Sequence, residues 1–199
     1  MSAKIYVEGG GDSKELHARC RQGFRRLVEN CGFGGRMPRL VACGGRGATF
    51  DNFSTAHAYA GEGDYVAMLV DSEDPVDNIE RTWAHLKQRD DWDQPDGADD
   101  EQVLLMTTCM ETWIMSDRQD LRDHYKTCLQ ESALPSLNDI ESRTRDSVQS
   151  ALVQATRTCK NRYAKGKRSF EILPRLNVPE LRRHLPSFAR CQRVLGDKL

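Results

Sequence analysis

The run at residues 65–71 (YVAMLVD) is the feature that most restricts how this chain can fold. Its first six residues are all apolar, and it ends in an acid. A strand buried on both faces needs a continuous apolar run of this kind, and such strands are typical of parallel sheets covered by helices on both sides. The run therefore predicts a central strand of an α/β layer.

Strand and helix patterns alternate around this run. Residues 4–7 (KIYV) form a short apolar strand that leads through glycines into an amphipathic helix, for which Gly32 is a suitable C-terminal stop. Further strands are predicted at 39–43 and 102–109, and helices at 50–61 and 77–89. The order β-α-β-α-β-α-β predicts a mostly parallel central sheet of about four strands flanked by helices, with the ligand site beyond the carboxyl ends of the strands.

The last third of the chain has a different pattern. Helical segments are predicted at roughly 111–131, 137–159 and 179–196, separated by prolines. A chain of 199 residues is long enough for one core and short for two domains. We expect residues 1–116 to form an α/β core and residues 117–199 to form a helical extension that completes the same domain.

Composition favours a globular protein away from membranes. Hydrophobic residues make up 38% of the chain and charged residues 30%, and no apolar stretch approaches the roughly 20 residues of a membrane helix. The first residues lack the apolar stretch of a secretory signal, so we expect a cytoplasmic protein. Net charge is −1. It is unevenly spread, however, with acids at 90–101 and basic residues at 157–168 and 175–193. The basic segments are either a phosphate-binding surface or an ordinary solvated face.

Seven cysteines are present, without a Cys-x-x-Cys pair or the histidine spacing of a zinc site. We expect free thiols in a reducing compartment, most of them buried as small hydrophobic side chains. They are Cys20, Cys31, Cys43, Cys109, Cys128, Cys159 and Cys191. No histidine neighbour that could activate Cys109 is evident, which argues against a thiol nucleophile.

Acidic residues follow three of the four predicted strands. Glu8 follows the first, Asp71 and Glu73 follow the third, and Glu111 follows the fourth. In a parallel sheet these positions share one edge, where carboxylates would repel one another unless a cation lay between them. Magnesium prefers oxygen ligands and retains several waters for substrate phosphates. The placement predicts a Mg²⁺ or Mn²⁺ site and phosphoryl chemistry.

Helix capping is the alternative explanation for acids after strands. It suits Asp12, Ser13 and Asp77 best. Glu8 is different, because three glycines follow it and leave only backbone on that side. The segment lacks the sequence of a P-loop or of a dinucleotide fold. A helix that begins after these glycines can still hold a phosphate through its free N–H groups.

The motifs VEGGGD, LVDSED and MET after successive strands resemble the Toprim catalytic domain, which occurs in topoisomerases, bacterial primases and the overcoming-lysogenization-defect nucleases. The larger set VEGGGD, CGGR, LVDSED, MTTCMETWIMSD and YAKGKRSF resembles a group of short bacterial Toprim-like proteins associated with anti-phage defence beside an ATPase. The second resemblance covers almost the whole chain. It implies a Toprim-like, Rossmann-like α/β fold.

The resemblance also implies roles for single residues. Glu8 would be the general acid/base or first metal ligand, Asp71 and Glu73 the metal-binding pair, Glu111 a further ligand, and Lys165 the catalytic lysine that stabilises charge on the phosphate. The sequence departs from the Toprim pattern in one place, because the Asp-x-Asp element is here Asp71-Ser72-Glu73. Either the longer Glu73 binds through a water, or the neighbouring Asp74 takes its place.

Three further cationic residues are candidates for substrate binding. Arg46 follows the second strand among glycines and can reach a phosphate with its bidentate fork, although a surface arginine in a turn would look the same. Lys167 and Arg168 follow Gly166, a pattern that suits close approach to a phosphate backbone or a solvated loop. Histidines and tryptophans are interpreted as surface or packing residues.

Two functions from different classes remain. The first is a Mg²⁺-dependent phosphodiesterase, a nuclease acting on DNA or RNA, restrained by a partner ATPase in anti-phage defence. The second is a non-catalytic Toprim-like module that docks on an ATPase or binds a phosphate or nucleotide. A transferase or phosphatase on the same layer is a third possibility, and a homo-oligomer is compatible with each.

Overall fold

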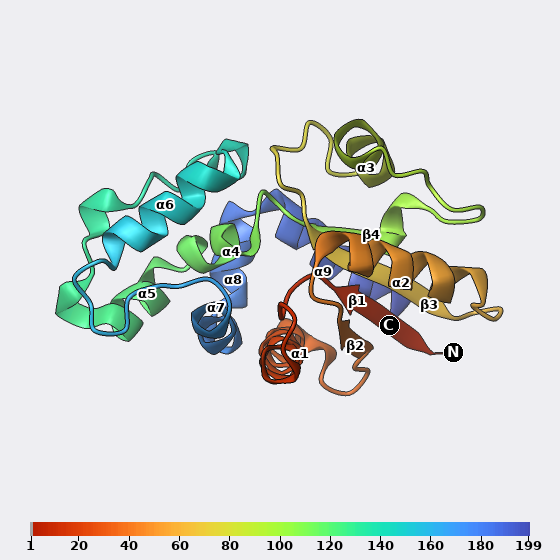
Figure 1. Ribbon diagram of the computed structural model, residues 1–199, viewed down its shortest axis with the longest axis horizontal. Helices are drawn as coiled ribbons and strands as arrows, with labels where there is room; N and C mark the ends of the chain where they lie inside the picture. Colours follow the sequence, from red (N-terminus) through yellow and green to blue (C-terminus); the bar gives the residue numbers. More distant parts are fainter. Residues whose placement is uncertain (1) are drawn as a thin grey trace.

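The computed structural model describes residues 2–199, and its centre is a four-stranded parallel sheet (Figure 1). The strand order is β2-β1-β3-β4, and Val7 of β1 pairs with Ala42 of β2 and with Leu69 of β3. The predicted α/β fold with a parallel central sheet is confirmed. The strands are β1 (Ala3–Val7), β2 (Arg39–Ala42), β3 (Tyr65–Asp71) and β4 (Val103–Met106).

Helices cover both faces of the sheet. On one face, Ile5 and Leu69 belong to a core shared with α1 (Lys14–Val28) and α9 (Pro186–Lys198). On the other, Tyr6 and Met68 pack with α2 (Arg46–Ala58) and α3 (Thr82–Asp90). Every residue of β3 is buried, as the apolar run at 65–71 predicts.

The remaining helices form a group beside the carboxyl edge of the sheet, at the left of Figure 1. The predicted helical C-terminal region is confirmed in this group together with α9. Its members are α4 (Met110–Ser116), α5 (Arg118–Tyr125), α6 (Arg145–Ala155), α7 (Lys167–Ile172) and α8 (Val178–His184). Short helical turns lie at Glu29–Phe33, Asp100–Gln102, Lys126–Cys128, Glu131–Ala133, Ile140–Ser142 and Leu173–Arg175.

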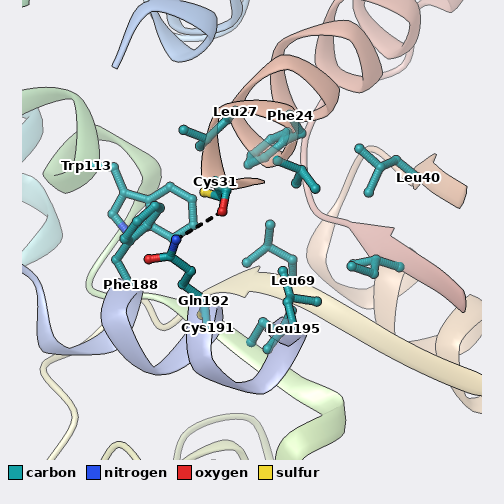
Figure 2. Close-up of a pocket in the computed structure, with 13 residues that line it drawn as sticks. Phe24, Leu27, Cys31, Leu40, Leu69, Trp113, Phe188, Cys191, Gln192 and Leu195 are labelled. Atoms are coloured by element: carbon teal, nitrogen blue, oxygen red, sulfur yellow. Dashed lines mark hydrogen bonds between the residues drawn. The ribbon is translucent and has the colours of Figure 1, made fainter. Parts of the chain in front are cut away.

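The C-terminal helix α9 is part of the main core. A small apolar cavity of about 40 Å³ lies between α1, the sheet and α9, lined by Phe24, Leu69 and Phe188 among others (Figure 2). At its border the Gln192 amide donates a hydrogen bond of 3.2 Å to the carbonyl oxygen of Cys31. The helix at the end of the chain thus holds the end of α1 in place.

Two helix starts differ from the predicted ones. Helix α3 begins at Thr82 and not at residue 77, because its free N–H groups are satisfied from a distant loop: Asp100 Oδ1 accepts from Trp83 N–H at 2.9 Å. Helix α2 begins at Arg46, directly after Gly45. The predicted cap of α1 is correct, since Ser13 Oγ accepts from Leu16 N–H at 3.1 Å.

The region between α5 and α8 is less helical than its pattern predicts. Only residues 145–155 of the predicted 137–159 segment form an α-helix, and a helix not predicted from the pattern lies at Lys167–Ile172. This short helix depends on tertiary contact. Gly23 of α1 permits its close approach, because a Cβ at that position would lie 3.1 Å from the Phe170 carbonyl oxygen.

The prediction of seven free thiols is wrong for two cysteines. Cys128 and Cys159 form a disulfide, and they are 31 residues apart. The other five are free thiols, of which Cys20, Cys109 and Cys191 are buried. The sequence contains no spacing motif that predicts this disulfide. Its two cysteines lie in irregular segments, one after α5 and one after α6, which come together only in the folded chain.

None of the helices within residues 2–199 has the length and apolar character required to cross a bilayer.

Candidate metal centre

Glu8, Asp71 and Glu73 meet at the carboxyl edge of the sheet. Each offers one carboxylate oxygen to a group in which these atoms all lie within 4.8 Å of one another. The chain leaves β1 to one side for β2 and then crosses to the other side for β3, so the point where the strand order reverses lies between β1 and β3. In sheets of this type ligands bind at that point, which is where Glu8 and Asp71 lie.

Two glycine turns form the floor beside the acids. Gly9 and Gly44 exchange backbone hydrogen bonds, each of 2.9 Å, which link the turn after β1 to the turn after β2. Gly44 has a φ of +77°, and a Cβ there would lie 2.7 Å from the Gly11 carbonyl oxygen, so no other residue fits without displacement. The turns border a pocket of about 390 Å³ that also reaches Asp71 and Lys165.

Asp71 is the most buried carboxylate of the three, with 4% of its surface exposed. Its Oδ1 accepts a hydrogen bond of 2.9 Å from the Met110 N–H at the start of α4. Burial raises the pKa of Asp71 well above its usual value, and the nearby carboxylates of Glu8 and Glu111 raise it further. In the metal-free protein this side chain is therefore driven towards the protonated state.

Glu8 is held from two sides. Its Oε2 accepts from the Asp71 N–H at 3.1 Å and lies 3.5 Å from a guanidinium nitrogen of Arg46. Burial raises the pKa of Glu8, while Arg46 and the Asp71 N–H lower it in part.

Glu73 reaches the group through an unusual backbone conformation. Its φ is +68°, and its N–H donates a hydrogen bond of 2.8 Å to the Thr108 carbonyl oxygen. The carboxylate forms an ion pair with Arg145 at the start of α6, and Arg89 lies 3.8 Å from it. Asp74, the alternative ligand considered from the sequence, lies outside the group: its side chain is 66% exposed and pairs with Arg89 at 3.3 Å.

Arg46 is engaged by the protein itself. Its guanidinium makes two contacts with Asp90, at 3.0 and 2.5 Å, donates to the Asp71 carbonyl oxygen and stacks on Trp92 at 4.8 Å from the ring centroid. With these partners it fixes Glu8 and the end of β3. The structure places it as a support for the acids, in contact with Glu8 and next to the pocket.

Glu111 lies behind the group and not within it. The side chain is fully buried, Oε1 accepts from the Tyr163 hydroxyl at 2.6 Å, and Oε2 accepts from the Gln149 amide at 3.3 Å. It remains close enough to Asp71 to raise the pKa of that carboxyl group. Direct ligation by Glu111, implied by the Toprim resemblance, would require release from Tyr163.

Lys165 borders the same pocket and forms an ion pair with Asp71, with its Nζ 3.9 Å from Asp71 Oδ2. Its side chain is 51% exposed, so the ammonium group can meet a ligand entering from solvent. Lys167 and Arg168 lie further away on α7. Lys167 borders a separate hollow with Arg19 and Arg26, and Arg168 pairs with Glu171 at 2.7 Å.

The residues that sequence reasoning missed are Arg89, Arg145 and Tyr163. The arginines lie inside predicted helices, where nothing distinguishes them from surface cations. Tyr163 belongs to the YAKGKRSF motif, although only the basic residues of that motif suggested a role.

The donor set fits a hard divalent cation. All of its atoms are carboxylate oxygens, the ligands that such a cation prefers, and burial raises the pKa values of Glu8 and Asp71, so that a bound cation would favour their charged forms. Carboxylates outnumber cations in this shell. The acids are Glu8, Asp71, Glu73, Asp74, Asp90 and Glu111, and the bases are Arg46, Arg89, Arg145 and Lys165.

Fold and site together define an α/β protein with a parallel sheet and a carboxylate cluster at the point where the strand order reverses. The chain belongs to the family described as "Domain of unknown function (DUF4276)", whose pattern matches residues 7–195. Comparisons with curated proteins and with solved structures found no match.

Proposed function

We propose that this protein is a Mg²⁺- or Mn²⁺-dependent phosphodiesterase that cleaves DNA or RNA. The observation that carries the proposal is that Glu8, Asp71 and Glu73 each place a carboxylate oxygen in a group within 4.8 Å, beside a pocket that Lys165 also borders. The resemblance of the VEGGGD and LVDSED motifs to the Toprim domain supports the same chemistry.

Each residue has a separate task in this proposal. Glu8, Asp71 and Glu73 would hold the cation, which when bound supplies Lewis-acid activation of a phosphate and its attacking water. Lys165, next to Asp71, would stabilise negative charge on the phosphate. Arg46, fixed by Asp90 and Trp92, would keep Glu8 oriented. Glycine turns leave the floor of the pocket open for a phosphate to approach the backbone.

The test is cleavage of plasmid, single-stranded DNA and total tRNA in Mg²⁺, Mn²⁺ or EDTA. Wild-type protein should cleave at least one substrate with metal and none with EDTA. Glu8→Gln should lower the rate about 100-fold or more, as removal of a group that stabilises the transition state does. The matched control is Glu62→Gln, which changes an exposed acid in a distant loop and should keep the rate within about two-fold.

A non-catalytic binding module is the second candidate. The observation that favours it is that Arg145 already pairs with Glu73, Arg46 with Glu8 and Lys165 with Asp71, so that all three acids have cationic partners without a metal. Titration calorimetry with Mn²⁺, combined with the cleavage assay, separates the two functions. Metal binding without cleavage of any substrate would support the module.

An ATPase partner, action in anti-phage defence and a cytoplasmic location complete the proposal, and all three rest on the sequence resemblance and composition. Affinity capture of the tagged full-length chain from the cells that express it, followed by mass spectrometry, should recover an ATPase from the soluble fraction. Recovery of the chain alone, after mild cross-linking, would contradict the partnership.

A further inference from the structure

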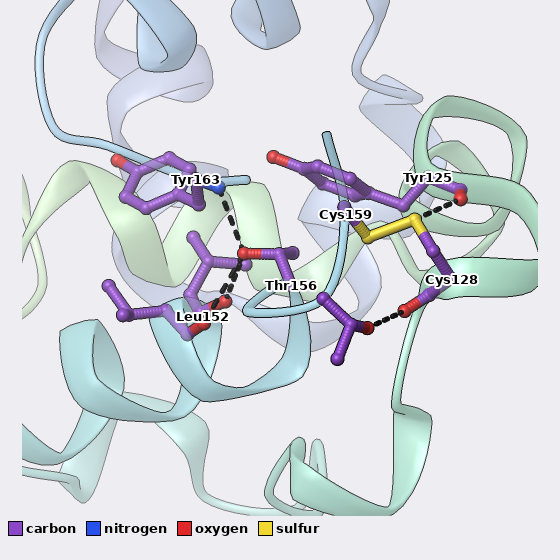
Figure 3. Close-up of a disulfide and its surroundings, with 8 residues drawn as sticks. Tyr125, Cys128, Leu152, Thr156, Cys159 and Tyr163 are labelled. Carbon is purple, nitrogen blue, oxygen red and sulfur yellow. Dashed lines mark hydrogen bonds between the residues drawn. A yellow bond between two sulfur atoms is a disulfide. The ribbon is translucent and has the colours of Figure 1, made fainter. Parts of the chain in front are cut away.

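The disulfide between Cys128 and Cys159 joins two segments that consist of short turns and irregular backbone (Figure 3). Cys128 ends the short turn Lys126–Cys128 after α5, and Cys159 follows the end of α6. Cys128 is partly exposed, whereas Cys159 is 5% exposed. Cys128 is therefore the more accessible partner for a thiol reagent.

The residues after Cys159 lead directly to the candidate metal centre. Residues 156–166 form turns and irregular backbone between α6 and α7. Hydrogen bonds lie on either side of the disulfide: Tyr163 N–H donates to Thr156 Oγ1 at 2.9 Å, and the Thr158 hydroxyl donates to the Cys128 carbonyl oxygen at 3.3 Å. Gln130 N–H also donates to the Ala155 carbonyl oxygen at 2.8 Å. The disulfide is the covalent link between the segment after α5 and the segment after α6.

This segment carries two side chains of the centre. The Tyr163 hydroxyl contacts both Glu111 and Ser169 at 2.6 Å, and Ser169 Oγ accepts from the Gly166 N–H at 3.2 Å. Lys165, next to Gly166, forms an ion pair with Asp71. Displacement of the segment would remove the lysine and free the buried Glu111, while Glu8, Asp71 and Glu73 stay on the sheet.

We propose that Cys128–Cys159 is a redox site that controls the placement of Lys165 and Tyr163 in the candidate metal centre. A dithiol reductant breaks the bond through a mixed disulfide, giving two electrons and two protons to the cysteine sulfurs and becoming a disulfide itself. Residues 156–166 then lose their covalent anchor. The cation-binding acids keep their places, and the lysine wall of the pocket loosens. The effect on activity rests on the proposed function, and the effect on the segment does not.

Limited trypsin digestion of the full chain tests the segment directly. The cleavable residues Lys160, Arg162 and Lys165 all lie between the disulfide and α7. With dithiothreitol, cutting at these three positions should accelerate at least five-fold, while cutting at the exposed Arg36, in the turn before β2, should stay within two-fold. Equal acceleration at Arg36 would indicate general unfolding and overturn the proposal.

Alkylation and mass spectrometry test the bond itself. Unreduced protein should carry five reactive thiols after denaturation, those of Cys20, Cys31, Cys43, Cys109 and Cys191. Reduced protein should carry all seven. Seven thiols in unreduced protein purified without reductant and treated with a mild oxidant would overturn the proposal.

Two cysteine variants test whether the trypsin response depends on this disulfide. Cys128→Ser should show the fast trypsin pattern without reductant, and Cys31→Ser, which changes a free cysteine elsewhere, should respond to dithiothreitol as wild type does. If Cys128→Ser fails to fold, the comparison of oxidised and reduced wild type still decides. Mn²⁺ affinity should change less than about three-fold on reduction, whereas any nuclease activity should fall at least ten-fold. A protein without nuclease activity that still shows the trypsin response would refute the proposed function and retain the redox site.

Discussion

At the scale of single residues, Asp71 shows how the centre is built. Its Oδ1 is bound to the backbone of α4, its Oδ2 faces Lys165 from the segment before α7, and its own N–H binds Glu8 after β1. Four parts of the chain therefore meet at one buried carboxylate. The cost of burying that charge beside Glu8 and Glu111 appears as a raised pKa.

Replacing Asp71 by asparagine should abolish metal binding without lowering the stability of the fold. We expect metal-free Asp71→Asn to unfold at the same temperature as wild type or higher, because an amide removes the repulsion and still accepts from Met110. Mn²⁺ at about 100 times its Kd should stabilise wild type by about 2.7 kcal/mol, or roughly 5–10 °C, and should leave the variant unchanged. Thermal melting with and without Mn²⁺ measures both effects. Asp51→Asn, at an exposed site, is the control, and an equal Mn²⁺ shift in Asp71→Asn would contradict the site.

Glu141 should make stability depend on pH. Burial raises its pKa to about 7 from 4.5, although Ser187 at the start of α9 donates to it and lowers it in part. The folded state binds this proton more tightly, so the stabilisation is complete below about pH 4.5 and is lost as pH rises through 7. Between these two pH values the free energy of unfolding of wild type should fall by at most about 3 kcal/mol more than that of Glu141→Gln. The glutamine variant keeps an acceptor for Ser187 but has no proton to lose. Urea denaturation at pH 5 and pH 8 gives the difference, and equal pH slopes for both proteins would refute it.

At the scale of elements, the glycine turns after β1 and β2 determine the shape of the pocket. The exchange of hydrogen bonds between Gly9 and Gly44 brings the two turns so close that a single methyl group cannot enter between them. Local sequence alone predicts two flexible turns. Their mutual contact makes one rigid floor next to Glu8.

Gly44→Ala tests this floor against a matched control. Gly63 also has a positive φ, of +80°, but a Cβ there meets nothing within 4 Å. Gly63→Ala should lower the free energy of unfolding by only about 1–2 kcal/mol, which is the cost of a positive φ for alanine. Gly44→Ala should lower the free energy of unfolding by about 3 kcal/mol or more, because its methyl group also collides with the backbone. It should also weaken Mn²⁺ binding. Guanidinium unfolding and Mn²⁺ titration provide the comparison, and equal losses would contradict the account.

At the scale of the whole molecule, α9 links the last part of the chain to β4, the edge strand of the sheet. Arg190, 4% exposed, donates to the carbonyl oxygens of Val103 and Asp100 and to the Glu80 carboxylate. It thereby joins α9, β4 and the loop before α3. The last helix is thus packed against the sheet that holds the centre.

Arg190→Ala should lower the free energy of unfolding by about 1–3 kcal/mol, since it removes a buried side chain and its donor to the Val103 carbonyl oxygen, whereas Asp100 and Glu80 keep Thr82 and Arg193 as donors. Arg193→Ala removes a second arginine paired with Glu80, but that side chain is 49% exposed and its loss should cost less than about 1 kcal/mol. Chemical denaturation of both variants measures the contrast. Similar losses would show that α9 is held by its apolar face alone.

Much of the fold could be predicted because its elements depend on local patterns. The apolar run of β3 and the glycine-terminated strand β1 require burial in a parallel sheet wherever they occur. Helices whose ends depend on distant partners were predicted less well. Helix α3 is capped by Asp100, and α7 exists because Gly23 lets Phe170 pack against α1.

By itself the sequence determined that Glu8, Asp71 and Glu73 share one edge, because residues that follow parallel strands must lie on the same side of the sheet. Only the tertiary structure decided that Glu111 turns to Tyr163, that Arg46 and Arg145 support the acids, and that Cys128 pairs with Cys159. The reason is physical: the β-α-β order of the sequence makes neighbouring strands parallel, whereas the orientation of a side chain depends on partners that only folding brings within reach.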